Sequence, residues 1–197
     1  MTAQIYVLDT ETTGLEGAPK DVVVEIGIAR VDLDREKVYP EYSRIINAPL
    51  SEAQRSSWVF QNTDLTPEDC LSSPYFTGDV AHELMYLYAF KTFTAYNVAY
   101  DFGMFLDHDP WNFKPILAPC IMEECADRYS KDGRWFSAQA AYNLLCPDNP
   151  TKLPGGREEH RAMSDAIFEG HILLALCEKN LDIRDRYIET IEGAWRK

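Results

Sequence analysis

The sequence predicts an α/β fold, with strands near the N-terminus and helices prevailing toward the C-terminus. Three strand-like segments follow one another at residues 3–8, 21–31 and 35–46, and strands in direct succession favour an antiparallel meander. A further short strand, 92–96, runs into a segment with the spacing of a helix, and helical patterns dominate from there. Because no linker interrupts the chain, we expect one domain over residues 1–197.

The three N-terminal strands differ in the strength of their patterns. Segment 3–8 is a continuous run rich in Ile, Val and Leu, as expected for a buried strand, and Gly14 closes the turn after it. In segment 21–31 the apolar residues at positions 22, 24, 26 and 28 fall on one face of a strand. Segment 35–46 is weaker and follows the polar turn 32–35.

Residues 47–62 have no clear pattern but include Trp58, Val59 and Phe60 in polar surroundings. Two interpretations stay open. The segment is either a loop packed by its own aromatic side chains or a surface on which a ligand such as a nucleobase stacks.

Helix signals fill most of the remaining chain. Thr66 followed by Pro67 and two acidic residues is a good helix start. Within segment 97–106 the helical period directs three apolar side chains to the core, those of Phe102, Phe105 and Leu106. The other predicted helices span 79–89, 121–129, 137–145, 161–178 and 183–195, with an extended piece at 115–117 and a loop at 146–159.

The composition narrows the functional classes. The five cysteines are odd in number and form no C-x-x-C pair, so we expect neither a disulfide framework nor a structural zinc site. The net charge of −13 argues against a protein that coats DNA through a basic surface, but it is compatible with one that holds only a strand end. No apolar run is long enough to span a bilayer, and no secretory signal is visible. We therefore expect a cytoplasmic protein without a membrane partner.

Two carboxylates, Asp9 and Glu11, follow the first strand at a spacing of i and i+2. Side chains two apart in an extended chain project from the same face, so the two anions lie side by side. Such anions repel each other unless a cation lies between them, and oxygen ligands favour Mg²⁺ or Mn²⁺. The alternative is a polar turn at the end of the strand, with Glu11 simply solvated.

Three further residues carry the same chemistry. Asp101 begins the helix after the 92–96 strand, and His160 and Asp165 lie on either side of a boundary between a loop and a helix. If His160 is in the loop and Asp165 on the helix, both side chains can reach one site. The glycines at 155–156 would give His160 the freedom to do so.

Together these residues form the motifs Asp9-Thr-Glu11-Thr-Thr-Gly-Leu, Asn97-x-x-x-Asp101 and His160-Arg-Ala-x-x-Asp165. The set, in this order, resembles the DEDDh branch of the 3′-to-5′ exonucleases, which comprises DnaQ-like and ribonuclease T-like enzymes. The resemblance implies a ribonuclease H-like fold. Its mixed central sheet joins a three-stranded antiparallel meander to parallel strands and is flanked by helices.

The resemblance also implies hydrolysis of phosphodiesters with two Mg²⁺ or Mn²⁺ ions as cofactor. Asp9 would bridge both ions, and Glu11 and Asp101 would complete their oxygen ligands. Asp165 would bind the ion that activates water, and His160 would accept the proton of that water. The alternative for His160 is a solvated histidine in a loop.

Four residues are expected at the substrate. Backbone amides and a hydroxyl of Thr10 and Thr12 are expected to meet the terminal nucleotide. By the resemblance, Leu15 would wedge against the last bases; alternatively, it is a buried turn residue. Asn97 either contacts the ligand or only caps the helix that carries Asp101.

One segment departs from the family pattern. Many members have a His-Gly-Ile-Thr-like stretch before the second motif, where this chain has Asn62-Thr-Asp-Leu-Thr66. The histidine is missing and Asp64 stands near the glycine position, so a phosphate contact that some members make there is in doubt. The segment around Trp58 and Phe60 could replace it.

We therefore expect a metal-dependent enzyme that releases nucleoside monophosphates from the 3′ end of single-stranded or frayed DNA. Trimming of RNA by the same mechanism is the first alternative. The second is a catalytically silent protein that binds nucleic-acid ends or accompanies a polymerase, although all five catalytic positions are filled. The resemblance also allows a polymerase or a second copy of the chain as a partner.

Overall fold

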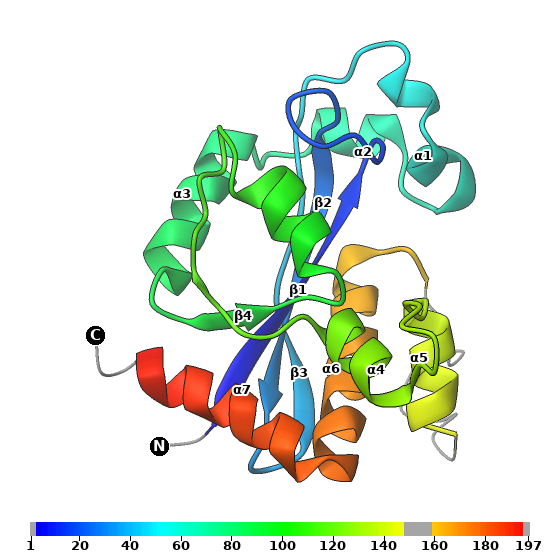
Figure 1. Cartoon of the computed structure of the whole chain (residues 1–197). Coiled ribbons are helices and arrows are strands. Elements are labelled where there is room, and N and C mark those ends of the chain that lie inside the picture. The colour runs from blue at the N-terminus through cyan, green and yellow to red at the C-terminus, as the bar shows by residue number, and fades with distance from the viewer. Residues whose placement is uncertain (1–2, 148–158, 195–197) are drawn as a thin grey trace.

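The computed structural model of the chain describes residues 3–147 and 159–194 (Figure 1). Its centre is a five-stranded sheet with the order β3-β2-β1-β4-β5. Its strands are β1 (Gln4–Thr12), β2 (Val23–Asp32), β3 (Lys37–Ile45), β4 (Thr92–Thr94) and β5 (Ile116–Leu117). The first three are antiparallel neighbours, whereas β4 and β5 run parallel to β1. The predicted α/β class, with a meander joined to parallel strands, is therefore confirmed.

Helices cover both faces of this sheet (Figure 1). They are η1 (Gln54–Ser56), α1 (Trp58–Asn62), α2 (Pro67–Ser72), α3 (Thr77–Tyr88), η2 (Ala99–Leu106), α4 (Ile121–Tyr129), α5 (Ala138–Leu145), α6 (Ala162–Lys179) and α7 (Leu181–Ala194). One face packs against α6, with α4, α5 and α7 around it, and the other packs against α2, α3 and η2. Among the described residues, no helix has the length and apolar character needed to cross a membrane.

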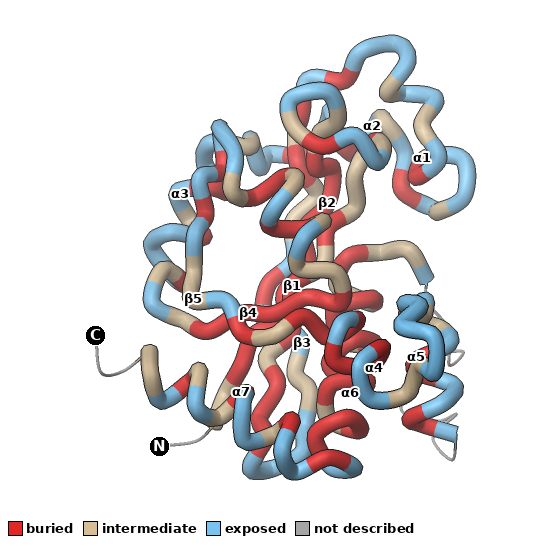
Figure 2. Tube along the Cα trace, viewed as in Figure 1, coloured by how far each residue is buried: buried red, intermediate tan, exposed pale blue. Residues whose placement is uncertain are grey.

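The alternation of side chains along β1 divides its residues between the two faces. Ile5 and Val7 belong to the apolar cluster under α6, and Tyr6 and Leu8 belong to the cluster under α3 and η2. Buried positions accordingly run along β1, β2 and α6 (Figure 2). Because side chains two apart share a face, Asp9 continues the row that faces α6.

β1 is longer than predicted, so both N-terminal carboxylates lie inside the strand rather than after it. The antiparallel pairing continues beyond Leu8, with Asp9 opposite Gly27 and Glu11 opposite Glu25. The hydrogen-bond ladder with β2 keeps the backbone extended where the side-chain pattern changes from apolar to polar. The apolar pattern alone therefore placed the end of this strand too early, at residue 8 instead of Thr12.

Segment 47–62 is not the continuous loop of the first interpretation, because it contains η1 and α1. The short helix α1 turns Val59 into the core and leaves Trp58 56% exposed. Tertiary burial of Val59 supports a helix that the polar surroundings did not signal. The other predicted helices agree within a few residues, and the helical segment expected over 97–106 is a π-helix.

The predicted core positions of segment 97–106 are confirmed, because Phe102, Phe105 and Leu106 of η2 are buried. The five cysteines are also buried, and none of them forms a disulfide. The predicted loop at 146–159, including its glycines at 155–156, lies largely outside the described residues.

Because Gly27 has no side chain, the backbone at the start of α6 packs directly against the backbone of β2. A Cβ atom at this position would overlap the backbone of Ala162 and Met163. Since Gly27 pairs with Asp9 across the strands, this close contact brings the first turn of α6 to the part of β1 that carries the carboxylates.

An ion pair holds the same junction. The guanidinium of Arg161 donates two hydrogen bonds to the buried carboxylate of Glu25, at 2.9 and 2.8 Å, and the backbone N–H of Ala162 donates a third at 3.1 Å. Glu25 therefore accepts donors from the residues that open α6, which fixes where that helix begins against the sheet.

Replacement of the glycine tests this arrangement. Because the new methyl group has no space, Gly27→Ala is expected to lower the free energy of unfolding by about 1–3 kcal/mol, measured by denaturant titration. Gly193→Ala in α7 is the control, since nothing lies within 4 Å of the added Cβ. That variant is expected to be neutral or stabilised by up to about 1 kcal/mol; equal behaviour of the two would contradict the close contact.

Candidate active site

Asp9 is surrounded by other negatively charged side chains. Its Oδ2 atom is buried and has no hydrogen-bond partner among the described residues. Burial, followed by the charges of Glu169 and Asp101, raises the pKa of Asp9 well above its usual value. A buried carboxylate oxygen without a donor is unfavourable, and a divalent cation would satisfy it. The residues around Asp9 thus fit a hard cation with oxygen ligands.

Asp101 lies in the first turn of η2 and is held by β1. Its Oδ1 atom accepts hydrogen bonds from the backbone N–H of Thr10 at 3.1 Å and from the Thr10 hydroxyl at 2.7 Å. Burial raises the pKa of Asp101 to about 7, against the opposing effect of these bonds. Thr10 therefore orients Asp101, and its predicted contact with a nucleotide stays a prediction.

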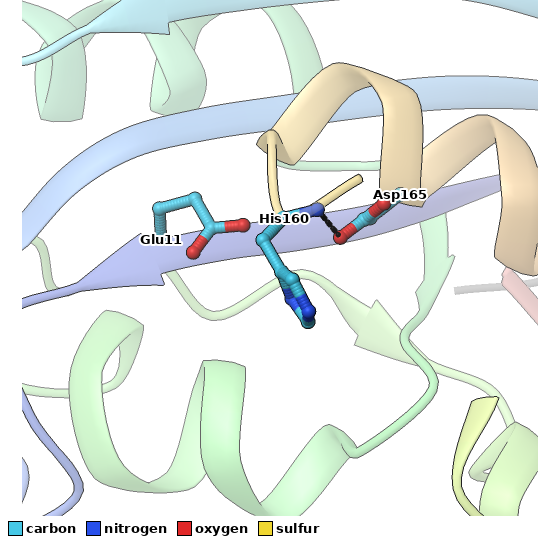
Figure 3. Close-up of side chains that lie close together, drawn as sticks. All are labelled: Glu11, His160 and Asp165. Atoms are coloured by element: carbon cyan, nitrogen blue, oxygen red, sulfur yellow. Dashed lines mark hydrogen bonds between the residues drawn. The ribbon is translucent and has the colours of Figure 1, made fainter. Parts of the chain in front are cut away.

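Three further side chains, which come from different segments, lie close together (Figure 3). Ligand atoms of Glu11, His160 and Asp165 all lie within 4.8 Å of one another. Glu11 comes from β1, His160 from the chain just before α6, and Asp165 from the first turn of α6. The sequence motifs that are far apart along the chain are thereby brought to one place.

Asp165 also fixes the backbone that carries His160. Its two carboxylate oxygens accept the backbone N–H groups of Glu159 and His160, each at 2.9 Å. His160 adopts φ 55°, a left-handed conformation that is rare for a residue other than glycine. The two hydrogen bonds hold the chain in this turn, with His160 between Glu11 and Asp165 (Figure 3).

The segment around α1 contacts the outer side of the histidine. The rings of Trp58 and His160 meet edge to face, with centroids 4.9 Å apart. Next to them, Arg161 donates a hydrogen bond of 2.7 Å to Asp64, the residue expected near the missing family glycine. In this chain Asp64 therefore binds Arg161, the residue that follows His160.

The remaining predicted substrate residues line the same end of β1. Leu15 is 79% exposed, which excludes the buried-turn alternative. The hydroxyl of Thr12 hydrogen-bonds to Tyr100 of η2 at 2.5 Å. Asn97 accepts the backbone N–H of Tyr100 at 3.2 Å through its side chain, as its helix-capping alternative requires. Their contacts with a substrate stay predictions.

One acidic residue of this region was missed by the sequence analysis. Glu169 of α6 is 4% exposed and accepts the backbone N–H of Tyr96 at 3.2 Å. The signal was present, because a residue four positions after Asp165 lies on the same side of a helix.

The family assignment follows from a match over most of the chain. A family model described as Exonuclease, RNase_T, matches residues 6–171. The chain belongs to this exonuclease family. The predicted resemblance to DEDDh-type, DnaQ-like exonucleases is confirmed by this match and by the solved structures. Among curated proteins, none matches the exonuclease.

Several solved nucleases share the fold of the exonuclease. Exonuclease X in complex with 5′ overhanging duplex DNA has a TM-score of 0.64 at 18% identity, covering 93% of this chain and 99% of that one. The nuclease domain of 3′hExo, a DEDDh family member bound to rAMP, has a TM-score of 0.65 at 13% identity, with 91% and 94% covered. E. coli Exonuclease I in complex with a dA16 oligonucleotide has a TM-score of 0.64 at 15% identity; the match covers 92% of this chain but 42% of that one.

The raised pKa of Asp101 predicts how the stability of the metal-free exonuclease depends on pH. The folded-state pKa of about 7 exceeds the unfolded value of about 3.9, so the folded state favours the protonated group. The stability from this group is full below about pH 4 and is lost as the pH rises through about 7. Asp9 acts in the same direction.

In EDTA, the melting temperature should therefore fall between about pH 5 and about pH 8. Asp101→Asn keeps acceptors for Thr10 but does not titrate, so its melting temperature should fall less over this range. Asp185→Asn, at an exposed position of α7, should retain the wild-type dependence. Identical slopes for all three proteins would contradict the raised pKa.

Proposed function

We propose that the chain is a divalent-metal-dependent 3′-to-5′ exonuclease that releases nucleoside monophosphates from single-stranded or frayed DNA ends. One observation carries the proposal. Ligand atoms of Glu11, His160 and Asp165 lie within 4.8 Å of one another, next to a buried oxygen of Asp9 that has no hydrogen-bond partner among the described residues. This combination provides oxygen ligands for cations and a nearby base for water.

Asp9, Glu11, Asp101 and Asp165 are the residues that would hold two Mg²⁺ or Mn²⁺ ions. When bound, such ions polarise the phosphodiester, lower the pKa of water and stabilise the leaving oxygen. Thr10 keeps Asp101 in place through its two hydrogen bonds. The protein thus supplies a rigid set of carboxylates before any substrate arrives.

His160 is the proposed general base. One of its ring nitrogens accepts a proton from the attacking water, whose oxygen forms a bond to phosphorus while the bond to the 3′ oxygen of the preceding nucleotide breaks. That oxygen leaves as the new 3′-hydroxyl after protonation, and the product is a nucleoside 5′-monophosphate. The contact of His160 with Trp58 limits the orientations of the imidazole.

Recognition of a strand end agrees with the charge and surface of the chain. A net charge of −13 disfavours long contacts with a phosphate backbone. Leu15 and Trp58, 79% and 56% exposed, offer apolar surface near the carboxylates for one or two bases. The site would then hold a frayed end through apolar contacts with its last bases and through bound cations.

RNA is the alternative substrate class. Solved structures with the same fold include complexes with a dA16 oligonucleotide and with rAMP, and those ligands are stated of those proteins. Digestion of matched DNA and RNA oligonucleotides separates the two possibilities. Faster or equal turnover of RNA would overturn the proposed DNA preference, whereas DNA turnover at least several-fold faster would support it. A polymerase or a second copy of the chain stays a predicted partner.

The direct test is a 5′-labelled single-stranded DNA oligonucleotide incubated with the protein and Mg²⁺ or Mn²⁺. A ladder that shortens from the 3′ end is expected. EDTA should abolish it because it removes the cation, and Asp9→Ala should abolish it because the cation loses a ligand. Asp185→Ala, at an exposed position, should cut like the wild type. If the wild type leaves both DNA and RNA intact, a binding role without catalysis becomes the better proposal.

A second test concerns the base. His160→Ala is expected to reduce the hydrolysis rate by about 10² to 10⁴, the usual contribution of a general base. The remaining activity should lose the limb of the pH–rate profile that reports the imidazole. His82→Ala, which alters an exposed histidine of α3, should keep both the rate and the profile. An unchanged profile in His160→Ala would refute the assignment.

A further inference from the structure

Glu169 lies within the carboxylate site although it belongs to none of the sequence motifs. It follows Asp165 by four residues on α6, so both side chains leave the same side of the helix one turn apart. α6 packs against β1 and β2, and only 4% of the surface of Glu169 is exposed. Its carboxylate is therefore directed into the protein near Asp165.

A hydrogen bond fixes where this carboxylate ends. Glu169 Oε2 accepts the backbone N–H of Tyr96 at 3.2 Å. In the parallel pairing of β1 with β4, Tyr6 lies opposite Phe93 and Val7 opposite Thr94. Tyr96 follows Thr94 by two residues, as Asp9 follows Val7 on the parallel strand. Glu169 is thus held near the end of β1 that carries Asp9.

The electrostatics agree with this geometry. Among the charges that raise the pKa of Asp9, that of Glu169 has the largest effect, ahead of Asp101, Glu11 and Asp165. Negative charges that act on each other in this way are unfavourable without a cation.

We propose that Glu169 is a fifth carboxylate of the metal centre, whose negative charge strengthens the binding of the cation held by Asp9. The inference rests on the metal-dependent function proposed above. Four carboxylates, those of Asp9, Glu11, Asp101 and Asp165, carry −4 and balance the +4 of two divalent ions. Glu169 brings the total to −5, so the occupied site keeps one excess negative charge, and it fills at lower concentrations of free metal.

Glu169 acts as a positioning residue and by its charge, without contacting the reacting atoms. The hydrogen bond to Tyr96 sets its place. Changes to residues that support metal ligands typically weaken metal binding by about 10- to 100-fold. Glu169→Gln separates the two contributions, because its amide oxygen still accepts the N–H of Tyr96 while the charge is removed.

The experiment is calorimetric titration of the whole chain with Mn²⁺ alone. Glu169→Gln is expected to raise the dissociation constant of at least one ion about tenfold or more, and Glu169→Asp, which keeps the charge, should stay within a few-fold of the wild type. Glu178→Gln is the matched control, since it removes the same charge from an exposed position of α6. It should bind Mn²⁺ like the wild type.

Melting in EDTA gives a second readout. The Glu169→Gln variant should melt at a higher temperature than the wild type, because a like charge beside Asp9 is gone, and Mn²⁺ should raise its melting temperature less. A variant that melts lower in EDTA or does not fold would show a structural role and overturn the proposal. If the wild type itself binds no Mn²⁺, the proposed function fails. If the wild type binds and Glu169→Gln binds equally tightly, only the role of Glu169 fails.

Discussion

The site depends on the backbone contact between the start of α6 and β2. Gly27 provides the space for this contact, and Glu25 provides acceptors for Arg161 and for the backbone of Ala162. Because β2 pairs with β1 at this level, the first turn of α6 comes to lie over the end of β1. Without that contact the carboxylates of the strand and those of the helix would belong to separate surfaces.

The parts of the fold that rest on local pattern were predictable. The apolar run before Asp9 and the alternation in β2 predict paired strands, and pairing fixes the face on which Asp9 and Glu11 appear. The strands and the shared face follow from short-range geometry that the sequence carries directly. The motif with His160 and Asp165 was instead identified through the resemblance to DEDDh exonucleases, which its position across a predicted helix boundary supported.

Other parts depend on contacts between distant segments and were not visible in the sequence. The helix α1 forms where Val59 enters a core supplied by other elements. Trp58 contacts His160, which lies far along the chain. Glu169 is an intermediate case. Its helical spacing from Asp165 was visible, but its place in the site depends on a hydrogen bond from the backbone of Tyr96, in a distant segment.

The concentration of acidic groups has a thermodynamic consequence for the fold. Burial of Asp9 and Asp101 raises the pKa of both groups, so the metal-free protein carries charges that oppose its own compact state. Surrounding interactions must offset this, and the ladder of β1 with β2 and the Thr10 bonds to Asp101 contribute. Part of the free energy gained on folding therefore offsets the cost of holding these carboxylates close together.

Arg161 connects the segment after α1 to the sheet. Its guanidinium bonds to Asp64 on one side and to Glu25 on the other, and it directly follows His160 in the chain. The region around α1 therefore reaches the histidine by two routes, through the ring contact of Trp58 with His160 and through the bond of Asp64 to Arg161. A ligand that displaced this region would change the position of His160 as well.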